Sequence, residues 1–281
     1  ISFAGWNLFG SFAVVMKNQG VNILLNVFFG PVVNAARGVS SQVSTSLTSF
    51  VVNFQTALRP QIIKSYASEN IKYHLELVFS GAKYSYFLLY LLSLPILLET
   101  ETILQLWLKI VPEFSVIFVR LVIIAALIDS LSVTLMASIQ ATGKIKLYQV
   151  VIGLLMFSIL PISYVFFKLG FSPQSTYYVA LVIFIFIVIA RIFTVKKQIS
   201  FLIGDYMNQV ISKAFFVTVF SVLLSYSVLN FMEVGLLRLL VIFIIAIFST
   251  LIGIYFFGIN ENERYKTHKF IISLYRRLKK K

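Results

Sequence analysis

The sequence predicts an all-α, polytopic membrane protein with about eight transmembrane helices, and three observations carry this prediction. Hydrophobic residues make up 59% of the 281 positions and charged residues only 12%, whereas soluble domains have roughly 45–50% apolar and about 25% charged residues. Apolar runs long enough to cross a bilayer recur along the whole chain. The connections between these runs are short. The solvent that suits such a chain is lipid.

A spanning helix needs about 20 mostly apolar residues, because the hydrocarbon core is about 30 Å thick and each residue adds about 1.5 Å. The segments that meet this requirement are 2–28, 31–57, 75–98, 115–140, 147–169, 175–195, 214–231 and 235–257. The pair Gly30-Pro31 is expected to break the first span from the second. Residues 142–144 and 170–173 are expected to separate the fourth span from the fifth and the fifth from the sixth.

Three further segments are too short or too polar to be spans: 99–114, 198–212 and the tail 259–281. Residues 99–114, with Trp107, are expected to form a short external helix in the membrane interface. Residues 198–212 are expected to form an amphipathic helix on the cytoplasmic face. The last two spans contain no Asn, Gln or charge deep within them, so they read as accessory, lipid-facing helices. The expected organisation is a six-helix lobe (1–195), a cytoplasmic linker (196–213), two accessory transmembrane helices (214–258) and a basic cytoplasmic tail (259–281).

Lysine and arginine set the orientation. If the chain starts in the cytoplasm, the cytoplasmic segments carry sixteen of these residues and the external segments only two, Lys109 and Lys168. This asymmetry predicts a multi-pass protein of a bacterial inner membrane with its basic loops and C-terminus in the cytoplasm. It also accounts for the net charge of +14 without nucleic acid as a partner.

Several kinds of chemistry are disfavoured by composition. The chain has no cysteine, which excludes a disulfide framework, a thiol nucleophile and a cysteine-ligated metal. The two histidines, His74 and His268, are far apart and have polar or charged neighbours, so we expect solvated loop histidines and no metal site. No cofactor motif is present, and we expect no enzymatic activity.

The first span carries a polar stripe. Asn7, Ser11, Asn18, Asn22 and Asn26 follow one another in steps of 4, 7, 4 and 4, which places them on one helix face. An unsatisfied amide in the bilayer core costs several kcal/mol, so this face must meet protein or water.

The second span repeats the pattern with Arg37, Ser41, Ser44, Thr48 and Gln55. Two successive polar faces indicate a hydrated cavity. The alternative is a dry bundle in which these side chains form hydrogen bonds between helices.

Charges inside the spans mark candidate binding residues. Lys17 lies near the middle of the first span and Arg37 lies six residues after Pro31. Either side chain could serve a site or snorkel to the interface. Four other cations lie near span ends and are expected to snorkel: Lys83, Arg120, Arg191 and Arg238.

Asp129 is the only carboxylate deep within a span. It is a candidate coupling group, or it forms an ion pair with Lys83 or Arg37 of another span. Because the candidate cavity holds more positive than negative charge, the expected substrate is an anion. The candidate substrate-binding residues are therefore Lys17, Arg37, Asn7, Asn18, Asn22, Asn26 and Gln55.

Five segments carry a family resemblance: 3–10 (FAGWNLFG), 18–26 (NQGVNILLN), 28–38 (FFGPVVNAARG), 53–62 (NFQTALRPQI) and 106–112 (LWLKIVP). Over residues 2–150 the chain resembles polysaccharide flippases, of the O-antigen and capsule type, in the multidrug/oligosaccharidyl-lipid/polysaccharide exporter superfamily. The resemblance implies the C-terminal, six-helix lobe of a MATE-like fold plus two accessory helices. It also implies a polyprenyl-diphosphate-linked oligosaccharide as substrate, moved by alternating access.

The resemblance further implies an N-terminal lobe of the same full-length chain as a partner, and a sequence that begins with Ile1 is expected to be a piece of a longer one. A second hypothesis is a cation-coupled multidrug antiporter of the same superfamily, which needs carboxylates in its cavity. A third is a membrane polysaccharide polymerase or glycosyltransferase. It is disfavoured because such enzymes need a large external loop or an acidic cluster, and the sequence has neither.

Overall fold

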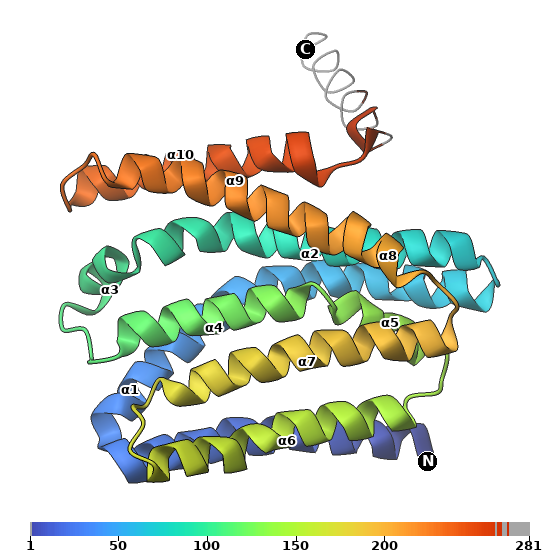
Figure 1. The fold of residues 1–281 in the computed structure, drawn as a ribbon, viewed down its shortest axis with the longest axis horizontal. Coiled ribbons are helices and arrows are strands. Elements are labelled where there is room, and N and C mark those ends of the chain that lie inside the picture. Colours follow the sequence, from blue (N-terminus) through green and yellow to red (C-terminus); the bar gives the residue numbers. More distant parts are fainter. Residues whose placement is uncertain (1, 262, 266–268, 270–281) are drawn as a thin grey trace.

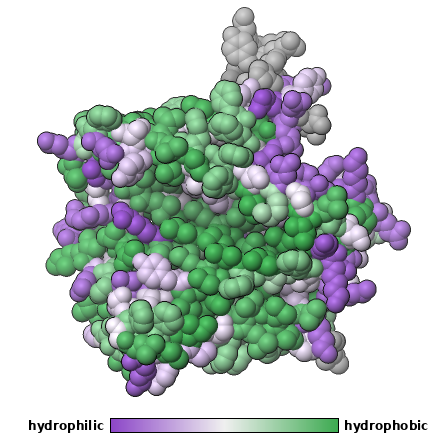
Figure 2. All heavy atoms as spheres, in the orientation of Figure 1, coloured by the Kyte–Doolittle hydropathy of each residue, from purple (hydrophilic) through white to green (hydrophobic). Residues whose placement is uncertain are grey.

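The computed structural model describes residues 2–261, 263–265 and 269, and every regular element among them is helical. Seven of these helices are long and apolar enough to cross a membrane. They lie side by side, with their axes running in roughly the same direction (Figure 1). The face in Figure 2 is apolar across its middle, and its hydrophilic residues gather towards the two ends of the helices. The chain is therefore an all-α, polytopic protein, as its composition predicts.

Helix α1 (Ser2–Ala67) is bent at Gly30, as the Gly30-Pro31 pair predicts. The backbone of Gly30 (φ 81°, ψ −175°) is one that other residues rarely adopt. Pro31 after it has no N–H to continue the helical ladder. The two arms of α1, residues 2–29 and 31–67, fold back on one another (Figure 1). A straight helix of 66 residues would extend about 100 Å, whereas each arm alone has a length suited to one crossing.

The next helices follow the predicted spans closely. Helix α2 covers Ile71–Leu98 and the short α3 covers Thr100–Leu108. Helices α4 (Ser115–Ser130) and α5 (Val133–Ala141) form one apolar segment that is interrupted at Leu131 and Ser132. Helices α6 (Lys146–Lys168) and α7 (Ser175–Gln198) complete this part of the bundle. The first arm of α1 lies along α6, and the second arm lies near α2 and α4 (Figure 1).

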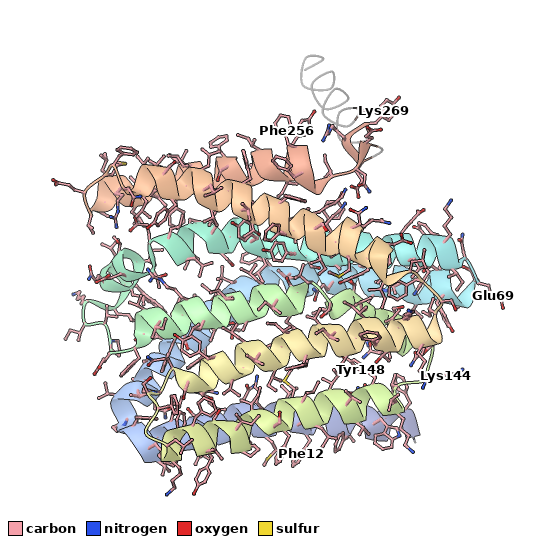
Figure 3. The ribbon with its side chains drawn as sticks, viewed as in Figure 1. Phe12, Glu69, Lys144, Tyr148, Phe256 and Lys269 are labelled. Atoms are coloured by element: carbon pink, nitrogen blue, oxygen red, sulfur yellow. The ribbon has the colours of Figure 1, made fainter. Side chains whose placement is uncertain are left out.

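The chain turns at two ends of the bundle. Residues 68–70, 142–145 and 199–202 connect helices at one end, where Figure 3 labels Glu69 and Lys144. We call this the basic end, because Lys64, Lys196 and Lys197 lie in the last turns of the helices that reach it. The bend of α1 and residues 109–114, 169–174 and 230–235 lie at the opposite end (Figure 1).

The segment predicted as a separate amphipathic helix, 198–212, is built differently. Helix α8 (Ile203–Tyr206), a π-helical turn (Met207–Ile211) and α9 (Ser212–Leu229) form one continuous helix. Tyr206 and Val210 are fully buried in it. The Tyr206 ring packs 5.3 Å from that of Phe79, and its hydroxyl donates to the Leu131 carbonyl at the α4–α5 interruption. The apolar stripe of this segment therefore faces α2 and the interruption between α4 and α5.

Helix α10 (Leu236–Gly253), followed by a second π-helical turn (Ile254–Gly258), pairs with α9 at one edge of the molecule (Figure 1). Two tyrosines of α2 join this pair to the bundle. The Tyr86 hydroxyl lies 2.6 Å from Thr218 Oγ1, and the Tyr90 hydroxyl lies 3.0 Å from Ser221 Oγ. Phe12 of α1 and Phe256 lie at the outside of the bundle (Figure 3), and their side chains are 63% and 60% exposed. Such exposed aromatic side chains suit contact with acyl chains.

The snorkelling prediction is wrong for three of the four cations near span ends, because each is paired with a carboxylate. Lys83 Nζ lies 2.6 Å from Glu263 Oε2, and Arg238 Nε lies 2.7 Å from Glu99 Oε1. Arg191 is buried and pairs with Asp129. Arg120 donates from Nε to Thr100 Oγ1 at 3.3 Å. A partner in the protein replaces the water that snorkelling would have provided.

The prediction of a solvated His74 is also wrong. His74 is fully buried at the start of α2, where its two ring nitrogens have hydrogen-bond partners on both sides. Nδ1 lies 3.1 Å from Ser65 Oγ and 3.0 Å from the Ile62 carbonyl, and Nε2 lies 2.7 Å from Ser138 Oγ. The ring therefore joins α1, α2 and α5. His268 lies outside the described residues.

The Lys83–Glu263 pair predicts a pH-dependent stability. Burial raises the pKa of Glu263, but the hydrogen bonds from Lys83 Nζ and the Asn260 N–H lower it more, and the net pKa is below its ordinary value. Stability from this carboxylate is therefore fully present above about pH 4.3, the ordinary pKa of Glu, and is lost as the pH falls through the folded-state value.

Thermal unfolding of the detergent-solubilised protein should show this loss when the pH is lowered from neutrality. Glu263→Gln should be less stable than the wild type at neutral pH, and the difference should shrink on acidification. A difference that stays constant down to the acid limit of the titration would contradict the assignment.

Candidate functional site

A cavity of about 360 Å³ lies between the two arms of α1, α4 and α7. The first arm contributes Lys17 and Asn18, and α4 contributes Asp129. The second arm contributes a row of mostly polar residues that runs from Arg37 to Gln55. Five of the residues singled out from the sequence thus meet in one place: Lys17, Asn18, Arg37, Gln55 and Asp129.

Lys17 enters the cavity from the first arm. Its Nζ lies 5.6 Å from the centre of the Phe184 ring on α7, within reach of a cation–π contact. In the part of the chain that the structure describes, Lys17 forms no ion pair. An ammonium group at this depth is costly without a counter-charge, so the site favours an anion close to Lys17.

Arg37 faces Lys17 from the second arm. Its Nη2 donates to the backbone carbonyl of Asn18 at 2.8 Å, which links the two arms across the bend at Gly30. Arg37 also forms no ion pair among the described residues. One hydrogen bond uses one of its five N–H donors, so the guanidinium retains donors for a ligand.

Asp129 is paired with Arg191 of α7, instead of with Lys83 or Arg37. Arg191 Nη1 lies 2.6 Å from Asp129 Oδ1 and 2.8 Å from Ser132 Oγ, and Nε donates to the Tyr148 hydroxyl at 3.3 Å. Figure 3 shows Tyr148 on α6, where it faces α7. Arg191 thus neutralises Asp129 and fixes the interruption between α4 and α5. Among the described residues, neither Lys17 nor Arg37 forms an ion pair in the cavity.

The other asparagines of the first arm lie outside the cavity. Asn7 accepts a hydrogen bond from Gln149 of α6 at 2.9 Å and donates to the Phe3 carbonyl. Asn22 is partly buried and Asn26 is exposed, and neither lines the cavity. The stripe therefore serves both alternatives that the sequence left open: Asn7 bonds between helices, whereas Asn18 faces the cavity.

Close packing fixes the position of the first arm. A Cβ atom at Gly20 would lie 2.5 Å from Leu160 of α6, and one at Gly153 of α6 would lie 2.7 Å from Phe9. These glycines allow α1 and α6 to approach closely. Lys17 is thereby held on the side of the arm that faces α7.

Sequence reasoning missed the contribution of α7. Thr176, Tyr177 and Phe184 line the cavity, and the Tyr177 hydroxyl lies 3.5 Å from Ser40 Oγ. The sequence of α7 has the composition of an ordinary apolar span, so neither charge nor a polar stripe marked these residues as part of a site. Among the described residues no group of three or more His, Asp or Glu side chains could hold a metal ion.

None of the protein families, curated proteins or solved structures compared with this chain matches it.

The Arg191–Asp129 pair yields a stability prediction. Arg191→Met should destabilise the protein by about 3–5 kcal/mol, because it leaves the Asp129 charge without its partner. The double variant Asp129→Leu/Arg191→Met removes both charges and should recover most of this loss in unfolding measurements. A double variant no more stable than Arg191→Met would argue against the pair as the reason for the loss.

Proposed function

We propose that this chain is one lobe of a transporter that moves a polyprenyl-diphosphate-linked oligosaccharide across a bacterial inner membrane, for surface polysaccharide synthesis. A single observation carries the proposal. Among the described residues, Lys17 and Arg37 line a cavity without a carboxylate partner, whereas Lys83, Arg191 and Arg238 each pair with a carboxylate.

The diphosphate suits this site because it carries more than one negative charge in a small volume. Arg37 can bind phosphate oxygens through two N–H groups at once, while Lys17 acts as a point charge. The cavity also offers Asn18, Gln55 and a row of hydroxyl groups, which can bind sugar hydroxyls. The polyprenyl chain would stay in the surrounding lipid.

The mechanism that we propose is alternating access between two lobes. Asn18, Ser41 and Thr45 line the cavity and are exposed in this chain, which leaves a polar side available to a second wall. An N-terminal lobe of the same full-length chain is the natural partner. The six-helix lobe and an accessory pair in a MATE-like fold agree with the peripheral position of α9 and α10 (Figure 1). The basic end would then face the cytoplasm.

A cation-coupled multidrug antiporter is the second candidate, and Asp129 is the residue on which it would depend. A drug cation or coupling ion needs an available carboxylate, but Asp129 already binds Arg191 at 2.6 Å. The cavity charge therefore favours an anionic substrate over a cationic one.

The proposal predicts which residues bind the diphosphate. In the full-length protein, Lys17→Ala and Arg37→Ala should each weaken binding of undecaprenyl diphosphate by about tenfold to a hundredfold. The reason is that a hydrogen bond to a charged group contributes about 1.5–3 kcal/mol. Lys17→Arg should keep most of the affinity. In cells, both alanine variants should lower surface polysaccharide at equal expression.

Lys168→Ala provides a matched control, because Lys168 is an exposed cation outside the cavity, in the last turn of α6. It should bind as the wild type does. Wild-type affinity in both cavity variants would refute the site. A wild-type protein that prefers cationic drugs to undecaprenyl diphosphate would favour the antiporter.

A further inference from the structure

We propose that Arg59 forms a loading site for the diphosphate at the basic end of the cavity. The second arm of α1 would then carry two anion-binding residues: Arg59 near the basic end, and Arg37 in the main cavity, nearer to the bend at Gly30. This inference rests on the proposed function and names the residue that the substrate meets first.

A smaller cavity of about 130 Å³ carries the argument. Its lining includes Gln55, Thr56 and Arg59 of α1 together with Gln140 of α5. It shares Val52, Gln55 and Val133 with the main cavity. The two spaces are therefore neighbours along the second arm, and the smaller one lies on the side of the basic end.

Arg59 is held in place by an uncharged partner. Its Nη2 donates to Gln140 Oε1 at 2.7 Å, which joins α1 to α5. Within the described part of the chain it forms no ion pair, and its side chain is exposed. The amide of Gln140 orients the guanidinium without neutralising it. Arg59 therefore resembles Arg37, which is likewise held by a neutral carbonyl.

One helix face connects the two arginines. Positions 37, 41, 44, 48, 52, 55 and 59 follow in steps of three or four, so they lie on one side of the second arm. The distance along the axis from Arg37 to Arg59 is about 33 Å, close to the thickness of a bilayer core. A substrate that follows this face crosses from one cation to the other.

Three of the hydroxyl groups between the arginines are poor phosphate ligands. Ser40, Thr48 and Thr56 donate their hydroxyl hydrogens to the backbone carbonyls of Arg37, Ser44 and Val52. Their oxygens remain free to accept, which suits the hydroxyl groups of a glycan. The charge-assisted hydrogen bonds to phosphate, which are the stronger ones, come from the cations of this face. Arg59 provides the first such contact at the mouth, ahead of Lys17 and Arg37.

The test measures how fast the ligand binds. Fluorescently labelled undecaprenyl diphosphate is delivered from phosphatidylcholine vesicles to the full-length protein in nanodiscs. Arg59→Ala should slow association about tenfold, because a charge at the mouth steers an anionic ligand, and should leave the dissociation rate near that of the wild type. Arg59→Lys keeps the positive charge and should associate within about twofold of the wild-type rate.

Lys64→Ala is the matched control, since Lys64 is an exposed cation one turn further on α1 that lines neither cavity. It should leave the association rate unchanged. Wild-type association by Arg59→Ala, or equal slowing by Lys64→Ala, would overturn the loading site while leaving the proposed function intact.

Two further measurements identify the chemistry of the ligand. Unlabelled undecaprenyl diphosphate should abolish the Arg59-dependent association, and phosphatidylglycerol at the same concentration should not. Competition by phosphatidylglycerol would mean that Arg59 holds an ordinary lipid headgroup, which overturns the loading site. If the wild-type protein binds undecaprenol as tightly as undecaprenyl diphosphate, the proposed function fails together with this inference.

Discussion

The need to neutralise charge inside an apolar environment governs how this chain is assembled. Among the described residues, three ion pairs meet the need, and each joins residues that are far apart in the sequence: Arg191 with Asp129, Lys83 with Glu263 and Arg238 with Glu99. These contacts fix α7 against α4, the segment after α10 against α2, and α10 against the start of α3. The peripheral pair of helices and the interrupted α4–α5 span depend on them for their positions.

The same need to neutralise charge distinguishes the cavity from the rest of the bundle. Within the described part of the chain, Lys83, Arg191 and Arg238 each have a carboxylate partner, whereas Lys17 and Arg37 have none. The cavity is therefore built around unbalanced positive charge. Its walls combine hydroxyl and amide groups with apolar side chains, and the polar residues Asn18, Ser41 and Thr45 of its lining are exposed.

The sequence predicted the helices well because length and hydropathy depend on neighbouring residues alone. The break at Gly30 also follows from local chemistry. The partners of charged residues were predicted poorly, since Arg191 and Asp129 are 62 residues apart and only the packing of α4 on α7 brings them together. The solvation of His74 was predicted wrongly for the same reason. Its sequence neighbours suggest an exposed residue, but packing buries it between Ser65 of α1 and Ser138 of α5. Lys17 and Arg37 were singled out as charges inside apolar spans, and Gln55 by the periodicity of the second span; the structure places all three at one cavity.

The bend at Gly30 has a consequence for ligand affinity. Lys17 precedes this residue and Arg37 follows it, so the separation of the two cations depends on the backbone torsions of one glycine. The two positive charges repel one another and favour separation of the arms, whereas a dianion between them favours approach. The occupied and empty cavities therefore prefer different angles between the arms. In the proposed transporter, binding of the diphosphate would therefore favour a smaller separation of the two arms.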